Sequence, residues 1–456
     1  MKLKLPLPKL RQILWLILLF IYIYAPPFNF LPLGINKLIA PIAVVGLLFW
    51  FKSATLKVLQ QKHVFMAICL MIVTTIYAFI IDTSTIYPND LAFSQTNTFS
   101  QAMVLVEVLP LTLFFSIYGI RKLKFTLANL LSSLVIIATI QSLIAIIMLL
   151  LPNLRMFVLT TVLNYDPSDS KIFRPDLFAF RSFGFSQDIL FSLSIVQGIA
   201  VAAILCLCLY NFTKYKYSLL LIVPLLLSIA LNARVGFVPI ILFTVITLLF
   251  NLFRLRIYLI AKFISFSVIS SLIIYLTISN FAFSSELDLE KNIGWVTEVF
   301  IHSKNFAQGE DSNTGNFGTI QNRFLHLPDS EAARIFGEGR YVFNNKRSTI
   351  KSDTGYVRRI YFGGYMYSIL AYGALIYLFV ASQGKTQLDA FKPLFYTLLF
   401  TALLSHFKGD IFLPIPGFRV IFLIFLFTVS ERRLKQPQLN RRFIPWYPHE
   451  TSNFRL

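Results

Sequence analysis

Apolar stretches long enough to cross a lipid bilayer recur from one end of this sequence to the other. A bilayer core about 30 Å thick requires about 20 apolar residues of helix. Hydrophobic side chains make up 56% of the 456 residues, more apolar surface than a soluble domain hides. We therefore predict an all-α polytopic membrane helix bundle. Its twelve or so spans are expected at 12–26, 35–51, 64–81, 102–120, 127–151, 187–210, 217–231, 235–252, 260–280, 360–381, 393–407 and 417–430.

The distribution of charge orients these spans. With the N-terminus inside, the short inner segments and the C-terminal tail hold 23 basic and three acidic residues, which accounts for the whole formal charge of +20. Such an excess is typical of the cytoplasmic side of a membrane protein, so both termini are expected in the cytoplasm. The basic residues are divided among seven short segments and form no stripe. A nucleic-acid partner is therefore not expected.

The spacing of the spans divides the chain into four parts. Spans one to nine occupy residues 1–280, a large outer loop occupies 281–359, spans ten to twelve occupy 360–430, and a basic cytoplasmic tail occupies 431–456. Within the outer loop, the charged patch at 329–336 is compatible with a short helix.

Ionisable side chains in or beside spans cost about 2.5–3.5 kcal/mol at the bilayer centre, so each needs a partner, water or a role. On this topology they gather near the outer face. Several arginines on one face suit a diphosphate, because guanidinium groups bind phosphate oxygens in pairs and stay charged. A single arginine at a membrane boundary more often reaches for lipid headgroups. The candidates are Arg181, Arg234, Asp353, Arg358, Arg359, His406, Lys408, Asp410 and Arg419.

Glu107 lies inside the fourth span, near its outer end. We expect it to be the buried, hydrogen-bonded partner of a neighbouring arginine or lysine. Sequence motifs for ATP hydrolysis, zinc chemistry and serine hydrolysis are absent. Neither a cofactor nor a metal is predicted, because no acidic cluster has ligand spacing on one helix face.

At these residues the chain resembles the bacterial O-antigen and capsule polymerase family, the Wzy-type oligosaccharide repeat-unit polymerases, which are related to O-antigen ligases. The resemblance covers nearly the whole chain, including the large outer loop late in the sequence. It implies a bundle like that of GT-C membrane glycosyltransferases, with an outer cavity open to lipid. The matching pieces are Arg181 with Gly184 and Gln187, Arg234 with Gly236, Asp353-Thr-Gly-Tyr before Gly363-Gly364, and His406-Phe-Lys408-Gly-Asp410 before Arg419.

Enzymes of this family join polyprenyl-diphosphate-linked oligosaccharide units at the outer face of the bacterial cytoplasmic membrane. The resemblance implies that Arg181 and Arg234 stabilise the donor diphosphate, and that Asp353 or His406 acts as the base. It gives the substrate-binding roles to Arg358, Arg359, Lys408, Asp410 and Arg419. The partners it implies are the lipid-linked oligosaccharides and the bilayer, and such a pathway leaves room for a chain-length regulator.

Two alternatives stay open. An O-antigen ligase would transfer finished glycan to a lipid A core, and a transporter would move lipid-linked oligosaccharide across the membrane. A transporter is expected to carry polar residues and helix breaks near the bilayer centre. Here most charge lies at the outer rim, beside a loop of about eighty residues, which favours the polymerase.

Overall fold

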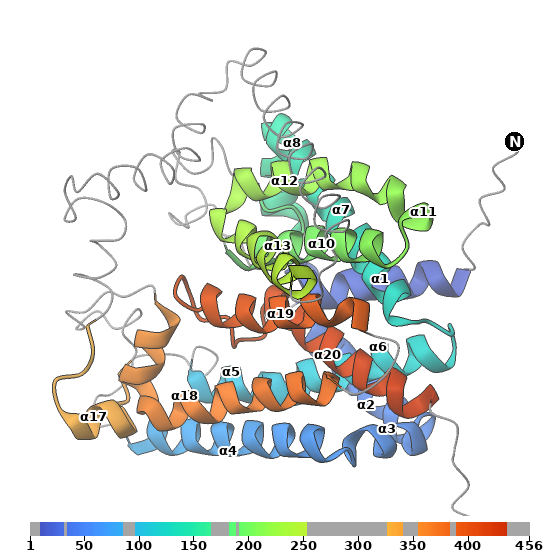
Figure 1. Cartoon of the computed structure of the whole chain (residues 1–456). Coiled ribbons are helices and arrows are strands. Elements are labelled where there is room, and N and C mark those ends of the chain that lie inside the picture. The colour runs from blue at the N-terminus through green and yellow to red at the C-terminus, as the bar shows by residue number, and fades with distance from the viewer. Residues whose placement is uncertain are drawn as a thin grey trace, which may run out of the picture.

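The computed structural model describes residues 10–31, 34–84, 96–165, 182–187, 191–252, 326–340, 354–383 and 389–435 (Figure 1). Within these ranges the regular structure is helical, apart from an isolated bridge between Phe28 and Leu163. The elements are α1 (Leu10–Tyr24), α2 (Ile35–Phe49), α3 (Lys52–Leu59), α4 (Lys62–Ser84), α5 (Asn97–Met103), η2 (Val104–Val108), α6 (Leu109–Arg121), α7 (Leu127–Leu150), α8 (Pro152–Phe157), η3 (Val158–Val162), α10 (Phe191–Tyr210), α11 (Phe212–Tyr215), η4 (Lys216–Leu221), α12 (Ile222–Asn232), η5 (Arg234–Gly236), α13 (Phe237–Leu252), α17 (Glu331–Phe336), α18 (Gly355–Ser382), η7 (Asp389–Phe391), α19 (Lys392–Ser405) and α20 (Pro416–Lys435).

The predicted helix bundle is confirmed at the level of secondary structure. Among the described residues, seven helices are long and apolar enough to cross a membrane, or eight if the bent pair α2 and α3 is one span. Every predicted span within the described residues falls on a helix, whereas the span predicted at 260–280 lies outside them. The charged patch at 329–336 contains α17, whose N-terminus is capped by the hydroxyl of Ser330.

The outward faces of the helices are as apolar as the inward ones. On α4, the exposed fractions are 57% for Phe65, 43% for Ile72, 53% for Ile76 and 54% for Phe79. These residues recur at intervals of three, four and seven, so they form a stripe along one face. A helix that is hydrophobic all round and exposed on one side fits a lipid environment rather than water. The outer surface of the described bundle thus supports a multi-pass membrane protein.

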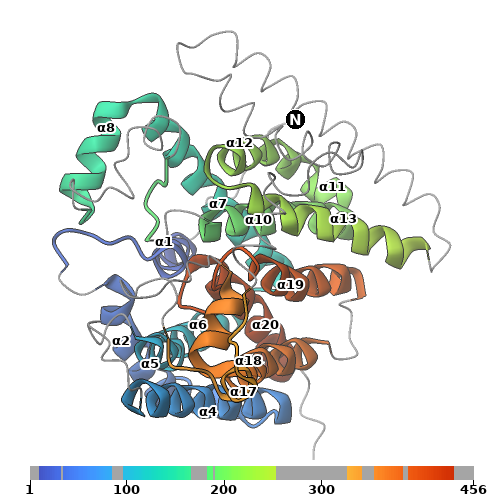
Figure 2. The same ribbon diagram turned by 90° about the vertical axis from the view of Figure 1, so that its left-hand side faces the viewer.

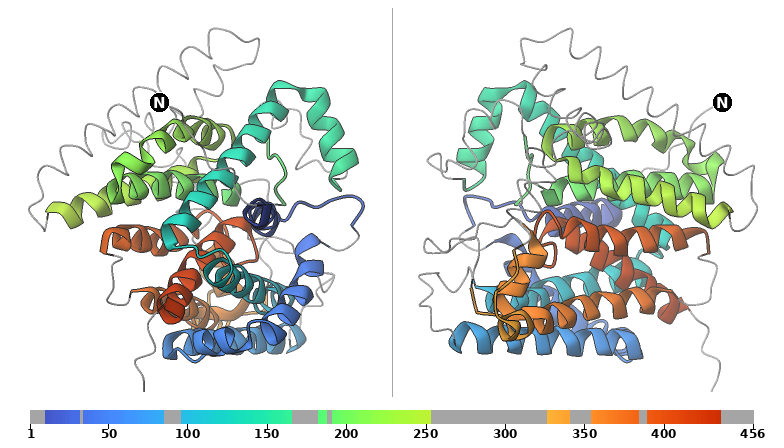
Figure 3. Two further views of the ribbon diagram at one scale, coloured as in Figure 1. Left: turned by 90° about the vertical axis from the view of Figure 1, so that its right-hand side faces the viewer. Right: turned by 60° about the vertical axis from the view of Figure 1, so that its left-hand side comes forward.

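The helices stack in layers around two that are buried almost throughout. In Figure 1 and the right panel of Figure 3, α12 and α13 lie on one side, α4 and α18 lie on the other, and α19 and α20 run between them. In the most apolar 18-residue stretch of α10, 89% of the residues are buried. Residues 420–429 of α20 are at most 1% exposed. Figure 2 shows α8 projecting away from the stacked helices, beyond the end of α7.

The order of the helices places particular ends together. The turns that carry α3 and α11 lie at one end of the bundle, and α17 with the start of α18 lies at the opposite end (Figure 1). Because successive helices alternate in direction, the starts of α10 and α20 and the end of α19 share the end marked by α17. This is the end that the charge distribution assigns to the outside.

α18 is broken in its first half, at Gly364, whose φ of 68° lies in the left-handed region. The break leaves two backbone carbonyls of α18 without helical partners. Glu338 N–H donates to the Tyr361 carbonyl at 2.8 Å, and Gly339 N–H donates to the Phe362 carbonyl at 3.0 Å. The segment after α17 therefore satisfies the backbone groups that the kink releases.

Candidate functional site

The start of α18 packs directly on the turn between α19 and α20. The Gly355 N–H donates to the His406 carbonyl at 2.9 Å. A Cβ at Gly355 would lie 2.5 Å from the His406 ring, so only glycine allows this approach. Tyr356 Oη donates to the Leu403 carbonyl at 2.7 Å. Two of the sequence motifs, the one that runs into α18 and the one that begins at His406, are thus brought together.

Arg359, on the first part of α18, is fixed by Asp410 in that turn. Its Nε lies 3.0 Å from Asp410 Oδ2, and its Nη2 lies 3.0 Å from Oδ1. The Arg359 side chain is 2% exposed, and its guanidinium also lies over the rings of Tyr367 and Phe412. Burial alone would raise the pKa of Asp410, but the charge of Arg359 brings it below its ordinary value. Arg359 and Asp410 therefore form a buried, two-point ion pair.

His406 lies in the turn, one residue beyond the end of α19 at Ser405. Its side chain is fully buried among the rings of Tyr356, Tyr372 and Phe412. Burial lowers the pKa of His406 from 6.5 to about 3, although the nearby carboxylate of Asp410 acts in the opposite direction. Nδ1 accepts from the Ile411 N–H at 3.3 Å, so Nε2 carries the proton of the neutral ring.

The second buried arginine of this end, Arg419 on α20, pairs with Glu107. Arg419 Nη2 lies 2.8 Å from Glu107 Oε1, and Nη1 donates to the Ile23 carbonyl at 3.2 Å. Asn36 Nδ2 donates to the same carboxylate oxygen at 3.3 Å. Glu107 lies in η2, a π-helical turn that interrupts the helix from α5 to α6. The prediction that Glu107 is the buried partner of an arginine or lysine is confirmed.

Arg234 opens η5, the tight connection between α12 and α13, and is half-buried. The connection is pressed against α10. A Cβ at Gly236 would lie 2.6 Å from the Ser194 carbonyl oxygen, and a Cβ at Gly198 would lie 2.0 Å from the Gly236 carbonyl oxygen. Side chains at these positions would force the turn away from α10. Glycine at both positions sets where Arg234 lies.

The first turn of α10 touches both groups of candidates. Gly417 N–H donates to Ser192 Oγ at 2.7 Å, and a Cβ at Gly409 would lie 2.7 Å from the Phe191 ring. In the same turn, Ser194 contacts the connection that carries Arg234, as described above. The turn from His406 to Arg419 and the connection at Arg234 therefore lie on two sides of the same helix start.

The remaining candidates differ in exposure. Lys408 is exposed and Arg358 is half-buried. Arg181 and Asp353 lie outside the described residues, each next to a described segment that begins at Ser182 or Thr354. Arg359 and Arg419 are thus buried with carboxylate partners, whereas the side chains of Lys408, Arg358 and Arg234 are exposed or half-buried.

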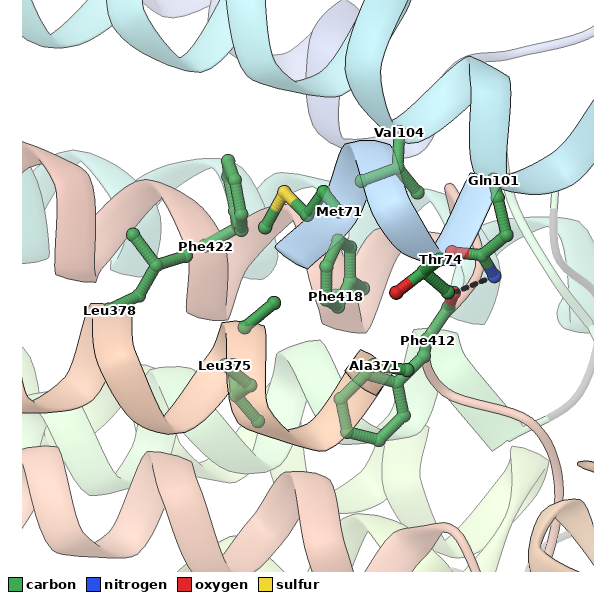
Figure 4. A pocket seen from close by; sticks show the side chains of 11 residues that line it. Met71, Thr74, Gln101, Val104, Ala371, Leu375, Leu378, Phe412, Phe418 and Phe422 are labelled. Carbon is green, nitrogen blue, oxygen red and sulfur yellow. Dashed lines mark hydrogen bonds between the residues drawn. The ribbon is translucent and has the colours of Figure 1, made fainter. Parts of the chain in front are cut away.

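The small cavity in Figure 4 is not the cationic hollow that the resemblance implies. It encloses about 20 Å³, enough for one water molecule, between α4, η2, α18 and α20. Its polar side chains are Thr74 and Gln101, and Gln101 Nε2 donates to the Phe412 carbonyl at 3.5 Å. None of the candidate residues lines it. Within the described ranges, no group of histidine, cysteine and carboxylate side chains is arranged to hold a metal ion.

Five buried amides near this end had no place in the sequence prediction: Asn36, Gln101, Gln141, Gln197 and Asn232. Each interrupts an otherwise apolar helix, and this pattern could have indicated a buried polar contact. It could not identify the partner, because an amide carries no charge that calls for an opposite one. Comparisons of this chain with protein-family models, with curated proteins and with solved structures find no match.

Proposed function

We propose that this chain is a glycosyltransferase of the bacterial cytoplasmic membrane, with twelve spans of GT-C type and both termini in the cytoplasm. It would polymerise polyprenyl-diphosphate-linked oligosaccharide repeat units, as in O-antigen or capsule synthesis. The observation that carries the proposal is the position of the α10 start. It lies between the connection bearing Arg234 and the junction bearing Arg358 and Lys408.

Two lipid-linked diphosphates must meet in such a reaction. Arg234, with Arg181, would hold the donor diphosphate on one side of α10. Arg358 and Lys408 would hold the acceptor diphosphate on the other side. Guanidinium and ammonium groups there would stabilise the negative charge that develops as the diphosphate leaves.

The ion pairs favour roles for Arg359 and Arg419 other than the substrate binding that the resemblance implies. Both guanidinium groups are buried against carboxylates, so their charge is already compensated. We assign them to holding the ends of α18 and α20 in place, and Asp410 belongs to the same framework. A phosphate reaching either arginine would have to displace a carboxylate, at the cost of an unpaired buried charge.

In the proposed reaction, a hydroxyl of the acceptor sugar attacks C1 of the donor sugar. The new C1–O bond forms as the C1–O bond to the diphosphate breaks, and the hydroxyl proton passes to a base. His406 is poorly suited as this base, because burial lowers its pKa to about 3 and Nδ1 is occupied by the Ile411 N–H. We therefore propose Asp353, which directly precedes Thr354 at the start of α18.

Reconstitution tests the proposal. Vesicles with purified protein would receive single lipid-linked repeat units extracted from cells in which this gene is deleted. Wild-type protein should convert them into a ladder of longer glycans. Arg234→Ala should lower the rate about 10²- to 10³-fold. Lys214→Ala is the matched control, because Lys214 is an exposed basic residue at the opposite end of the bundle.

Wild-type chain lengths from Arg234→Ala would contradict the proposal. A ligase would give a different result in the deleted cells, since long glycan would then accumulate on the polyprenyl carrier. A transporter would move the lipid-linked unit across the vesicle membrane without lengthening it. The kink of α18 at Gly364 is a feature of transport sites, and it lies in the first half of the helix.

A further inference from the structure

Buried amides and hydroxyls join α7, α10 and α12 in the interior of the bundle. Gln197 on α10 is fully buried. Its Nε2 lies 3.1 Å from Ser142 Oγ on α7 and 2.6 Å from Ser228 Oγ on α12. A buried amide is costly without partners, so these contacts fix how the three helices meet.

On α7, the residue next to Ser142 in sequence holds the turn at 182–187. Gln141, next to Ser142, donates from Nε2 to the Phe183 carbonyl at 2.7 Å, and its Oε1 accepts from the Phe185 N–H at 3.3 Å. Between them Gly184 has a φ of 56°, and a Cβ there would lie 2.6 Å from Gln141 Nε2. One side chain therefore holds both ends of a left-handed turn that directly follows Arg181.

At its α12 end, the network reaches the connection that carries Arg234. Asn232, the last residue of α12, donates from Nδ2 to the Ser228 carbonyl at 2.9 Å, and Nδ2 lies 3.4 Å from Ser228 Oγ. The chain turns at Ala233, whose carbonyl accepts from the Gly236 N–H at 3.1 Å. Ser228 thus bonds both the amide of Gln197 and the residue that ends the helix before Arg234.

We propose that Gln197 is a positioning residue that sets the separation between the turn at 182–187 and the connection at 233–236. Through Ser142 and Ser228, it aligns the helices on which these two segments are mounted. Arg234, beside the second segment, is thereby held at a set position relative to the turn at 182–187. This inference rests on the proposed function, and it adds residues that hold the site without touching substrate.

Hydrogen bonds suit this task better than apolar packing. Apolar side chains of similar volume can slide along one another, whereas amide and hydroxyl groups have directional partners. The network lies within otherwise apolar helices, so a shift of one helix would take the Nε2 of Gln197 out of reach of Ser142 or Ser228 in the core. A displacement of about 1 Å in the residues that position a substrate can lower the reaction rate about a hundredfold.

The test uses the purified full-length chain in lipid nanodiscs, with a sugar-free polyprenyl diphosphate as the probe. Two measurements are made on each protein: the melting temperature without probe and the affinity for the probe. Gln197→Met keeps the length of the side chain without its amide, and Ser228→Ala removes only the shared hydroxyl. Thr428→Val is the control, because the buried Thr428 hydroxyl bonds the Ile424 carbonyl of its own helix.

Positioning predicts that both variants lose affinity about tenfold or more, beyond any change in melting temperature that Thr428→Val also shows. Hydrogen exchange should rise at 182–187 and 233–236 in Gln197→Met. A lower melting temperature with wild-type affinity for the probe would overturn the proposal, because the network would then serve stability alone. If Gln197→Met does not fold, Ser228→Ala decides by the same two measurements.

Arg234→Ala separates this inference from the function on which it rests. Loss of probe affinity in Arg234→Ala, with wild-type affinity in Gln197→Met and Ser228→Ala, would overturn the positioning role and leave the proposed function standing. Wild-type probe affinity in Arg234→Ala would overturn both. Loss of affinity in all three variants, but not in Thr428→Val, is the expected result.

Discussion

The guanidinium of Arg359 and the carboxylate of Asp410 face each other across 51 positions of sequence, with Nε and Nη2 each 3.0 Å from an oxygen. This pair joins the first part of α18 to the turn between α19 and α20. Both side chains are buried, at 2% and 7% exposure. This end of the bundle is therefore held by a buried charge pair, and removal of either residue would leave the charge of the other uncompensated.

Removing one member of this pair should destabilise the protein strongly. Asp410→Asn leaves a buried guanidinium without its carboxylate, at a cost of about 3–5 kcal/mol. The double variant Arg359→Met with Asp410→Leu removes both charges and should recover most of the loss. Thermal unfolding of the three proteins in detergent measures this. If the double variant is less stable than Asp410→Asn, the pair is not the reason for the loss.

The stability of the protein should depend on the protonation of His406. Its pKa is lowered from 6.5 to about 3 by burial, so the unfolded chain binds a proton that the folded chain does not. His406 therefore contributes no penalty above about pH 6.5, and stability is lost as the pH falls from 6.5 toward 3. The slope approaches about 1.4 kcal/mol per pH unit within that window.

His406→Gln should flatten this part of the profile. The measurement is the melting temperature of both proteins between pH 4 and pH 8. Asp410 does not account for a change of stability in this range. Its pKa is lowered from 3.8, so the stability that its charge contributes is lost only as the pH falls below about that value. Parallel profiles for wild type and His406→Gln would contradict the assignment.

The pair of Glu107 and Arg419 should matter far more than an ion pair at the surface. Glu107→Gln leaves the charge of Arg419 unpaired in the core and is expected to cost about 3–5 kcal/mol. Lys435 and Glu431 lie 2.7 Å apart, but Lys435 is 42% exposed. Lys435→Ala should cost no more than about 1 kcal/mol. Similar losses of melting temperature in the two variants would argue against a buried role for Glu107.

The kink of α18 gives a prediction with a matched glycine control. Gly364→Ala requires φ near 68°, and the added Cβ would lie 2.2 Å from the Ile335 carbonyl oxygen. The left-handed conformation alone costs about 1–2 kcal/mol, and the clash adds to it. A Cβ at Gly34 meets nothing within 4 Å, so Gly34→Ala should stay within about 0.5 kcal/mol of wild type.

Hydrogen exchange at 331–340 locates the effect of that substitution. α17 packs on the kink, and Glu338 and Gly339 bond the carbonyls that the kink releases. Gly364→Ala should therefore speed exchange in this segment, whereas Gly34→Ala should leave it unchanged. Equal exchange in both variants would show that the kink does not hold α17.

Much of the fold follows from hydropathy, because the bilayer sets the length of a helix and the sequence repeats that length. The burial of Glu107 also followed, since a carboxylate inside a span requires a cation. Its choice of Arg419 did not, because the two residues are 312 positions apart and several basic residues were available. Pairing is decided by which helices become neighbours, and hydropathy does not specify that.

The candidate site could likewise be predicted only in part from the sequence. The sequence grouped the ionisable residues of the outer end, but it gave Arg359, Arg419 and Arg358 the same role. Only the positions of Asp410 and Glu107 distinguish them. The neutral amides Gln141 and Gln197 were missed, because a polar residue in an apolar helix shows that a partner exists without naming it.

Arg358 and Lys408 offer the sharpest contrast with Arg359. Lys408 is exposed and Arg358 is half-buried, as the proposed contact with the acceptor diphosphate requires, whereas Arg359 is enclosed with Asp410. A charge-assisted hydrogen bond contributes about 1.5–3 kcal/mol, or roughly tenfold to a hundredfold in binding. Lys408→Ala should therefore raise the concentration of lipid-linked unit that gives the half-maximal polymerisation rate, with the melting temperature unchanged.

Arg359→Met should behave differently from Lys408→Ala. Its melting temperature should fall, and its activity should fall because the protein is less stable. Lys408→Arg keeps a cation at the same exposed position and should retain most activity. This rescue is expected if the charge of Lys408 binds the diphosphate. Lys214→Ala, at the opposite end, controls for loss of one surface charge. A wild-type half-maximal concentration in both Lys408→Ala and Arg358→Ala would mean that neither residue holds the acceptor diphosphate.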